Sequence, residues 1–305
     1  MSLVKISAGF QFAHLYSRLF FLGCFIASFL YCIITRQVPS SYMFILQLFL
    51  FALAFKRGKE FIKDWALFFV FFILYSQSRG LVFQLIKYTR LNIHTDTLLI
   101  WEKALFGEII PTIWVQQYVA DVPTVIDYFA LFIYLSFFWL PMTFAFYLWI
   151  KNKEVFKRFL TAFALLSFMG LLTYLIFPAY PPWMASDFGL LPPLKRHLWN
   201  LNIGQWALSI FSGSNYNPIA PLPSLHAAWA LLTSYFMAKV FYSRLGILSH
   251  FFYIYFILVS MTIIYSGDHY VVDILAGVLY TIIAVILTNP EIGKMRFMAK
   301  KRQTT

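Results

Sequence analysis

The chain has 305 residues, of which 61% are hydrophobic and only 12% carry a charge, whereas soluble domains carry about 25% charged residues. This composition excludes an ordinary soluble domain and indicates an integral membrane protein. The net charge of +12 is also seen in nucleic-acid binders, but here the charges cluster in short connectors between apolar runs. We therefore expect the membrane bilayer, and no nucleic acid, as the partner of these charges.

Eight apolar runs approach the length of a transmembrane helix, which needs about 20 residues. In chain order they occupy residues 17–35, 42–55, 64–86, 125–150, 156–177, 222–242, 247–265 and 268–288. The second run is the shortest of them. The sequence thus predicts an all-α polytopic membrane protein with about eight transmembrane helices.

The connectors predict the orientation of the chain, because cytoplasmic loops carry an excess of Lys and Arg. Of the 24 Lys and Arg residues, seventeen fall on the side that holds the N-terminus and seven on the other. Both termini are therefore predicted to be cytoplasmic. By alternation, the runs that begin at 222 and 268 start at the extracytoplasmic or lumenal face.

Two long connectors lie on that outer face, at about 87–124 and 178–221. In the first, the apolar residues around Trp101 and Trp114 have the spacing of helices that lie in the membrane interface. The second is rich in proline. Loops of this length are usually functional or form a lid over a site.

Two histidines stand where an outer loop turns into an apolar run. His269 and Asp273 are four residues apart, which places them on one face if the run is helical. A carboxylate one turn from an imidazole fixes its tautomer and stabilises its cationic form. His226 opens the other run, so the sequence predicts one site made by two helix starts. An interfacial histidine beside a helix-capping acid fits the same pattern.

Pro223 and Ser224 precede the run that holds His226. The start of a helix leaves backbone N–H groups unpaired, and these can hold a phosphate. Ser224 and Leu225 are therefore candidates for phosphate binding, while an ordinary N-cap at Ser224 is the alternative.

These motifs resemble those of a known family. Pro-Ser-Leu-His at 223–226 and His-Tyr-Val-Val-Asp at 269–273, followed by Ala-Gly at 276–277, resemble the second and third signatures of the type 2 phosphatidic acid phosphatase (PAP2) superfamily. Phe-Pro-Ala-Tyr-Pro-Pro-Trp at 177–183 is similar to the Pro-Pro element of its inositol phosphorylceramide synthase-like branch. The resemblance covers about residues 64–288.

The resemblance implies a division of the chain and a role for each site residue. A six-helix catalytic domain would span 64–290, with a pair of transmembrane helices in 1–63 before it and a basic cytoplasmic tail in 291–305 after it. His269 would be the nucleophile that forms a phosphohistidine, Asp273 would support its ring, and His226 would protonate the leaving oxygen. The chemistry requires no metal or other cofactor, and no acidic or Cys cluster in the sequence argues for a metal.

The sequence departs from the phosphatases of the superfamily in its cations. Ile263 stands six residues before His269, where those enzymes carry an Arg, and their first signature, a Lys followed by Arg-Pro, is absent. A site with fewer cations suits a phosphodiester, which carries one charge less than a phosphomonoester. The departure favours transfer between phosphodiester lipids over hydrolysis.

Some cation must still meet the phosphate. Arg79 lies towards the outer end of its run, and an Arg at that depth favours an anionic partner. Snorkelling of Arg79 to the interface fits equally well. Weaker candidates, each of which could simply contact headgroups, are Lys87, Arg90, Lys195 and Arg196.

The leading hypothesis is a membrane lipid phosphotransferase that moves a phosphate-linked headgroup from a phospholipid or other lipid phosphate to a lipid acceptor or water. One alternative is a phosphatase for polyprenyl or phosphatidyl phosphates. Another is a lipid transporter or a non-catalytic lipid-binding membrane protein, whose site would lie near the bilayer midplane. Imidazoles more than about 10 Å apart could not share one phosphate and would favour this last alternative.

Overall fold

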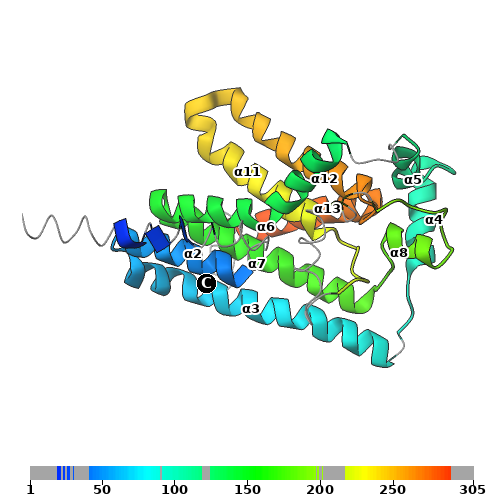
Figure 1. Cartoon of the computed structure of the whole chain (residues 1–305), viewed down its shortest axis with the longest axis horizontal. Coiled ribbons are helices and arrows are strands. Elements are labelled where there is room, and N and C mark those ends of the chain that lie inside the picture. The colour runs from blue at the N-terminus through cyan, green and yellow to red at the C-terminus, as the bar shows by residue number, and fades with distance from the viewer. Residues whose placement is uncertain are drawn as a thin grey trace, which may run out of the picture. The chain divides into compact units, whose positions relative to one another are not determined.

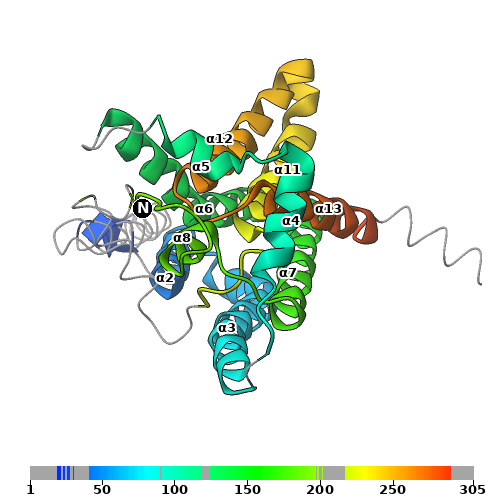
Figure 2. The same cartoon turned by 90° about the vertical axis from the view of Figure 1, so that its right-hand side faces the viewer.

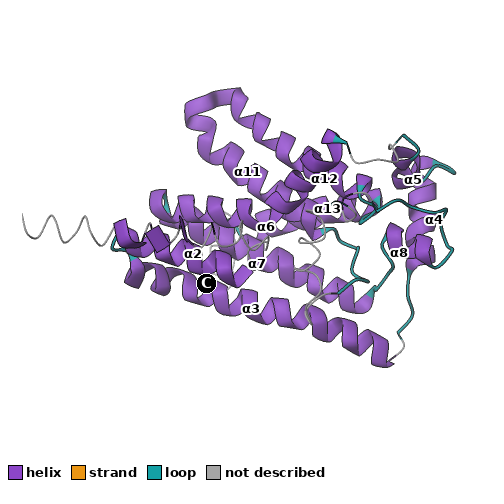
Figure 3. Cartoon of the chain, in the orientation of Figure 1, coloured by secondary structure: helices purple, strands orange, loops and turns teal. Residues whose placement is uncertain are grey.

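The computed structural model describes residues 41–89, 91–118, 124–196, 198, 201 and 217–289, and a few positions between 19 and 30. These residues form helices and loops, with no strand among them (Figure 1 and Figure 3). The helices are α2 (Ser41–Ala54), α3 (Gly58–Thr89), α4 (Thr95–Phe106), α5 (Pro111–Gln116), α6 (Val125–Lys151), α7 (Lys153–Ile176), α8 (Pro182–Asp187), α11 (Leu225–Leu245), the 3₁₀ helix η1 (Gly246–Phe252), α12 (Tyr253–Tyr265) and α13 (Val271–Leu287).

The predicted all-α membrane class is confirmed. Helices α3, α6 and α7 are each long and apolar enough to cross a membrane, as is the stretch Leu225–Tyr265. That stretch is a hairpin, because the chain reverses at η1 and α12 returns beside α11 (Figure 1). The apolar helices α2 and α13 are shorter, with 14 and 17 residues. The run at 17–35 and the tail at 291–305 lie mostly or wholly outside the described residues, so the number of eight spans stays a prediction.

Two helices begin later than their apolar runs predicted. Helix α11 starts at Leu225 rather than 222, where the Ser224 hydroxyl oxygen accepts the Ala227 N–H at 3.3 Å. Helix α13 starts at Val271 rather than 268, and its Asp273 carboxylate accepts the Tyr270 N–H at 2.8 Å. In both places a polar side chain pairs a backbone N–H at the helix start, and hydrophobicity alone does not reveal such a start.

The chain divides into two compact units. One holds residues 1–71 and 205–213, and the other holds 72–204 and 214–305. The first unit contains α2 and the beginning of α3. The second contains the remaining helices and every candidate site residue, so the site is a property of this unit.

Aromatic side chains fill the core of the second unit, where α6, α7 and α11 pack together. The indole of Trp229 stacks on Phe163 and Phe137, with ring centroids 4.4 and 5.2 Å apart. Its Nε1–H donates to the Ser167 hydroxyl at 3.1 Å. A buried indole N–H needs such a partner, and this bond fixes α11 against α7 below the site.

Helices α11 and α13 approach closely because Gly277 carries no side chain. An ideal Cβ at Gly277 would lie 2.6 Å from the main-chain oxygen of Ser224. Thr281 also donates its hydroxyl to the Ala228 carbonyl of α11 at 3.2 Å. The two helix starts that carry the histidines are thus held in direct main-chain contact.

The two long connectors contain the expected short helices. Leu98 of α4 and Ile110, just before α5, enter a buried cluster with Ala185 of α8 and Tyr270 at the start of α13. Other apolar side chains of this region are exposed, among them Ile100, Leu105, Ile109 and Trp114. Helices α4 and α5 therefore have one face packed on the bundle and apolar surface on the other, as an interfacial helix needs. Their place in a membrane interface stays a prediction.

We expect Gly277→Ala to separate α11 from α13, because the added methyl group would meet backbone rather than a flexible side chain. Overpacking of this kind costs about 1–3 kcal/mol, and the midpoint of thermal unfolding in detergent should fall accordingly. Gly23→Ala is the matched control, since no atom of the described residues lies within 4 Å of its ideal Cβ. Equal midpoints for the two variants would contradict the close approach.

Candidate active site

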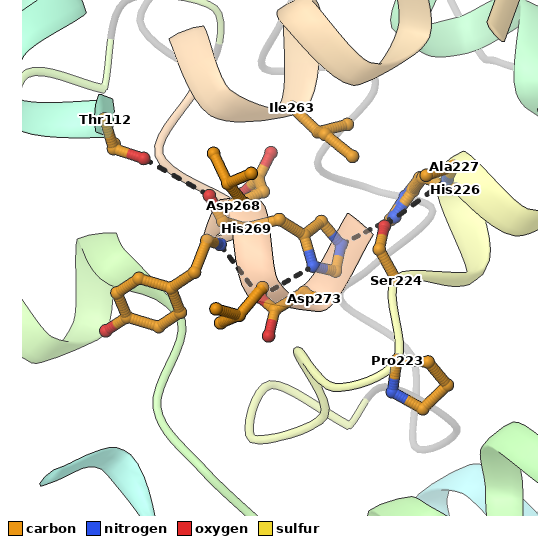
Figure 4. Close-up of polar contacts among 12 residues, drawn as sticks. Thr112, Pro223, Ser224, His226, Ala227, Ile263, Asp268, His269 and Asp273 are labelled. Atoms are coloured by element: carbon orange, nitrogen blue, oxygen red, sulfur yellow. Dashed lines mark hydrogen bonds and ion pairs between the residues drawn. The ribbon is translucent and has the colours of Figure 1, made fainter. Parts of the chain in front are cut away.

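The structure brings His226 and His269 together at the starts of α11 and α13 (Figure 4). Nδ1 of His226 lies 3.0 Å from Nε2 of His269. The two residues are 43 positions apart in the sequence. The prediction that two helix starts form one site therefore agrees with where the structure places the rings.

His269 sits on a turn and not inside the helix that the spacing suggested. Gly267 has a φ of +77°, a value that glycine adopts without steric cost, and the Asp268 and His269 N–H groups both donate to the Ile263 carbonyl. The Thr112 hydroxyl of α5 donates to the His269 carbonyl at 3.2 Å. This turn presents the ring of His269 to α11, and only 4% of the residue is exposed.

Asp273 is fully buried and has two partners. Its Oδ2 accepts the Tyr270 N–H at 2.8 Å and lies 3.4 Å from Nδ1 of His269. The bond to Tyr270 is the helix cap. The same oxygen therefore both caps α13 and faces the His269 ring, so the two interpretations of Asp273 do not exclude each other. Its Oδ1 is buried without a hydrogen-bond partner in the described part of the chain.

The network indicates the tautomers of the two rings. Because a carboxylate oxygen can only accept, Nδ1 of His269 carries the proton that points at Asp273, and its Nε2 keeps a lone pair. Nδ1 of His226 then donates to that lone pair across the 3.0 Å contact. Nε2 of His226 is buried and has no partner among the described residues.

Ser224 links the two helix starts through its backbone. Its N–H donates to the Asp273 carbonyl at 2.9 Å. Its hydroxyl caps α11, as the alternative of an ordinary N-cap expected. The Tyr174 hydroxyl donates to the Pro223 carbonyl at 2.9 Å and steadies the loop. Because the Ser224 side chain is already engaged in the cap, phosphate binding by Ser224 and Leu225 stays a prediction.

Among the candidate cations, Arg79 of α3 interacts electrostatically with one site histidine, His226. Its positive charge acts on His226, Tyr75 and Tyr174, and its Nε is buried without a hydrogen-bond partner in the described ranges. The weaker candidates are placed differently. Lys87 and Lys195 are exposed, Arg196 lies 4.0 Å over the Trp183 ring, and Arg90 falls outside the described residues.

Two aromatic side chains pack beside His226, and the sequence reasoning did not predict them. Tyr134 and Phe137 of α6 lie with ring centroids 5.1 and 4.3 Å from the imidazole. These rings exclude water from one side of His226. A single aromatic residue in an apolar span carries no signal of this role, because 21% of the chain is aromatic.

Glu102 of α4 is a second residue that the sequence reasoning missed. Its two carboxylate oxygens accept the N–H groups of Val271 and Val272, each at 3.0 Å. The pKa of the Glu102 carboxyl is raised, chiefly because the group is buried. The two N–H bonds oppose this shift, and the nearby Asp273 carboxylate adds to it. The available signal was that Glu102 lies one turn after Leu98, on the buried face of a predicted amphipathic helix.

Metal ligands are not grouped in the described part of the chain, where no cluster of three or more His, Cys, Asp or Glu could hold an ion. The expectation of a site without metal stays a prediction. The residues that meet at the two helix starts are the imidazole pair and one buried acid, and the charge of Arg79 acts on His226.

An all-α membrane protein with paired imidazoles at two helix starts has the architecture of an integral membrane phosphotransferase or phosphatase. The chain belongs to the PAP2 superfamily, whose family model matches residues 96–287. This match confirms the resemblance and makes the protein an enzyme of the PAP2 phosphotransferase and phosphatase type.

Two relatives fall in the branch that the Pro-Pro element indicated. The phosphoinositol dihydroceramide synthase of Bacteroides thetaiotaomicron is 28% identical over 210 residues, which are 64% of this chain and 67% of that protein. The catalytic subunit aur1 of the inositol phosphorylceramide synthase of Schizosaccharomyces pombe is 29% identical over 136 residues, which are 42% of this chain and 31% of that protein. No solved structure gives a significant match to this chain.

We expect Thr112→Val to slow turnover modestly, because it removes the hydroxyl that holds the His269 carbonyl while keeping the side-chain volume. One neutral hydrogen bond is worth about 0.5–1.5 kcal/mol, so kcat should fall by about 2- to 10-fold. Thr161→Val is the matched control, since its exposed hydroxyl donates to the Lys157 carbonyl of its own helix. Steady-state rates that are equal for both variants would show that Thr112 does not steady the turn.

Proposed function

We propose that this protein moves a phosphate-linked headgroup from one lipid to another at the extracytoplasmic membrane surface, through a phosphohistidine on His269. The observation that carries the proposal is the 3.0 Å contact between His226 and His269, with Asp273 behind the second ring. The relatives, named as synthases that join phosphoinositol to ceramide-type lipids, support headgroup transfer.

In the first step, the lone pair of His269 Nε2 attacks the phosphorus of the donor lipid. An N–P bond forms as the P–O bond to the lipid alcohol breaks, and His226, which enters this step as the imidazolium cation, gives one proton to the leaving oxygen and becomes neutral. Asp273 stabilises the positive charge that develops on His269. In the second step, His226 takes the proton of an acceptor hydroxyl, whose oxygen attacks phosphorus and releases His269.

The present contact between the rings must open before this chemistry begins. Two nitrogens at hydrogen-bond distance leave no room for a phosphoryl group between them. A productive complex needs a nitrogen-to-phosphorus contact of about 3–3.5 Å, so the rings must part. The buried Nε2 of His226, which has no partner among the described residues, loses no hydrogen bond there when the ring moves.

The charges around the site support transfer between phosphodiesters over hydrolysis of a phosphomonoester. Ile263, which occupies the place of the phosphatase arginine, is fully buried, and its carbonyl accepts two N–H groups of the histidine turn. Arg79 is the fixed cation whose charge reaches His226. One arginine with helix-start N–H groups matches the single charge of a phosphodiester.

The alternative of a transporter or a non-catalytic lipid-binding protein would be favoured by a site near the bilayer midplane, or by imidazoles more than about 10 Å apart. A separation of 3.0 Å argues against the second arrangement. The phosphatase alternative uses the same histidines with water as the acceptor, so the products of the reaction separate it from transfer. Release of inorganic phosphate from lipid phosphates without any acceptor lipid would overturn headgroup transfer.

We expect His269→Ala to abolish transfer and to prevent trapping of radiolabelled lipid phosphate on the protein, because the variant lacks the attacking nitrogen. His226→Ala should slow turnover by about 10²- to 10⁴-fold, the usual contribution of a general acid. His250→Ala is the control, since His250 is exposed and its ring hydrogen-bonds to the nearby Ile247 carbonyl, away from the histidine pair. Label that stays covalently bound to the His269→Ala protein would refute the nucleophile assignment.

We expect Arg79→Gln to weaken the reaction of phosphodiester lipids by about 10- to 100-fold in kcat/KM. A hydrogen bond to a charged group contributes about 1.5–3 kcal/mol, and every 1.4 kcal/mol is a factor of ten. Lys87→Gln, which removes an exposed cation near the end of the same helix, should change the rate less than twofold. Equal losses in the two variants would indicate general attraction to the lipid surface instead of a phosphate contact.

A further inference from the structure

Glu102 is a buried acid that is not part of the histidine pair, and it is hydrogen-bonded to the start of α13, the helix that follows His269. The residue belongs to α4, which crosses the start of α13 (Figure 2), and none of its surface is exposed. Its Oε1 accepts the Val271 N–H and its Oε2 accepts the Val272 N–H, both at 3.0 Å. The partners are 169 and 170 residues away in the sequence.

These two hydrogen bonds pair groups on both residues that would otherwise be buried without a partner. The first N–H groups of a helix have no partner inside it, and the helix dipole favours a negative charge there. A buried carboxylate, in turn, is strongly destabilising unless it is hydrogen-bonded. Glu102 and the start of α13 therefore need each other, and the bond ties α4 to the segment that carries His269 and Asp273.

The two residues bonded by Glu102 lie in the sequence between His269 and Asp273. Val271 and Val272 separate His269 from Asp273, so fixing their N–H groups fixes the backbone between the ring and its carboxylate. The 3.4 Å separation of His269 Nδ1 and Asp273 Oδ2 is long for a hydrogen bond. A small shift of this backbone would break that contact.

Glu102 also determines which helix start remains open to an anion. Both α11 and α13 begin at the site, and either start could attract a phosphate. At α13 the first two N–H groups are occupied by a carboxylate, whose charge also repels an anion. The phosphate is left with the start of α11, beside His226 and the charge of Arg79.

We propose that Glu102 is a positioning residue that holds the backbone between His269 and Asp273 and excludes the substrate phosphate from the start of α13. This inference rests on the function proposed above. Glu102 touches neither the substrate nor the reacting atoms. It acts through Val271 and Val272.

The test uses the full-length protein in detergent with a phosphodiester lipid donor, and compares Glu102→Gln, Glu102→Ala and the control Glu108→Gln. Glu102→Gln keeps the shape but has one accepting oxygen instead of two. Glu102→Ala removes both. Glu108 pairs with Lys103 on the surface, and its side chain is 89% exposed, so its variant should behave as the wild type. All rates are normalised to the folded fraction.

We expect kcat to fall by about 10- to 100-fold in Glu102→Gln, which corresponds to the loss of one charged hydrogen bond, with KM changed less than about twofold. Inorganic phosphate, added as a competing anion, should inhibit Glu102→Ala at least about threefold more tightly than the wild type, because the start of α13 is then open. A purely structural role would not tighten the binding of phosphate.

A normalised kcat equal to the wild type in Glu102→Gln overturns the positioning role. Unchanged or weaker inhibition by phosphate in Glu102→Ala overturns the exclusion of the anion, and if that variant does not fold, the same comparison is made with Glu102→Gln. Failure of the proposed function looks different: the wild type itself then neither transfers a headgroup nor traps labelled phosphate.

Discussion

The site depends on direct main-chain contact between the starts of α11 and α13. The Ser224 N–H donates to the Asp273 carbonyl at 2.9 Å, and the bare Gly277 lets the Ser224 carbonyl approach α13. Backbone is the least adjustable part of a protein, so this contact sets the distance between the helices within narrow limits. The 3.0 Å contact of the two imidazoles depends on that distance, because His226 lies in the first turn of α11 and His269 directly precedes α13.

The first long connector supplies the second constraint. Three polar side chains of α4 and α5 each bond the backbone of the histidine segment: Glu102 to the start of α13, Thr112 to the His269 carbonyl, and Gln116 to the Tyr265 carbonyl. Gln116 also bonds the backbone of Lys195 in the second connector. The two long connectors therefore stabilise the turn that presents His269. Apolar packing around Tyr270 shields these bonds from water, which makes each of them stronger.

The sequence was sufficient to predict the helices and the meeting of the two histidines, because apolar runs and loop-to-helix motifs are local patterns. It did not reveal that α13 begins after His269, since that start depends on the polar cap at Asp273 and on Glu102 from far along the chain. Nor did it reveal Tyr134 and Phe137 beside His226. Partners that approach only through tertiary packing leave no mark in the spacing of residues, whereas a helix period does.

The contact between the rings also restricts what can react. In the free enzyme the lone pair of His269 Nε2 is covered by the N–H of His226, and aromatic rings of α6 pack against His226. A ligand that opens this contact must replace the lost hydrogen bond, or it leaves a buried donor unpaired at a cost of about 1–3 kcal/mol. A phosphate ester can do so, because one oxygen accepts from His226 while the phosphorus faces His269. A water molecule can accept the same proton but offers His269 no electrophile. If His269 is the nucleophile, as proposed, only a phosphate ester both opens the contact and provides the atom to be attacked.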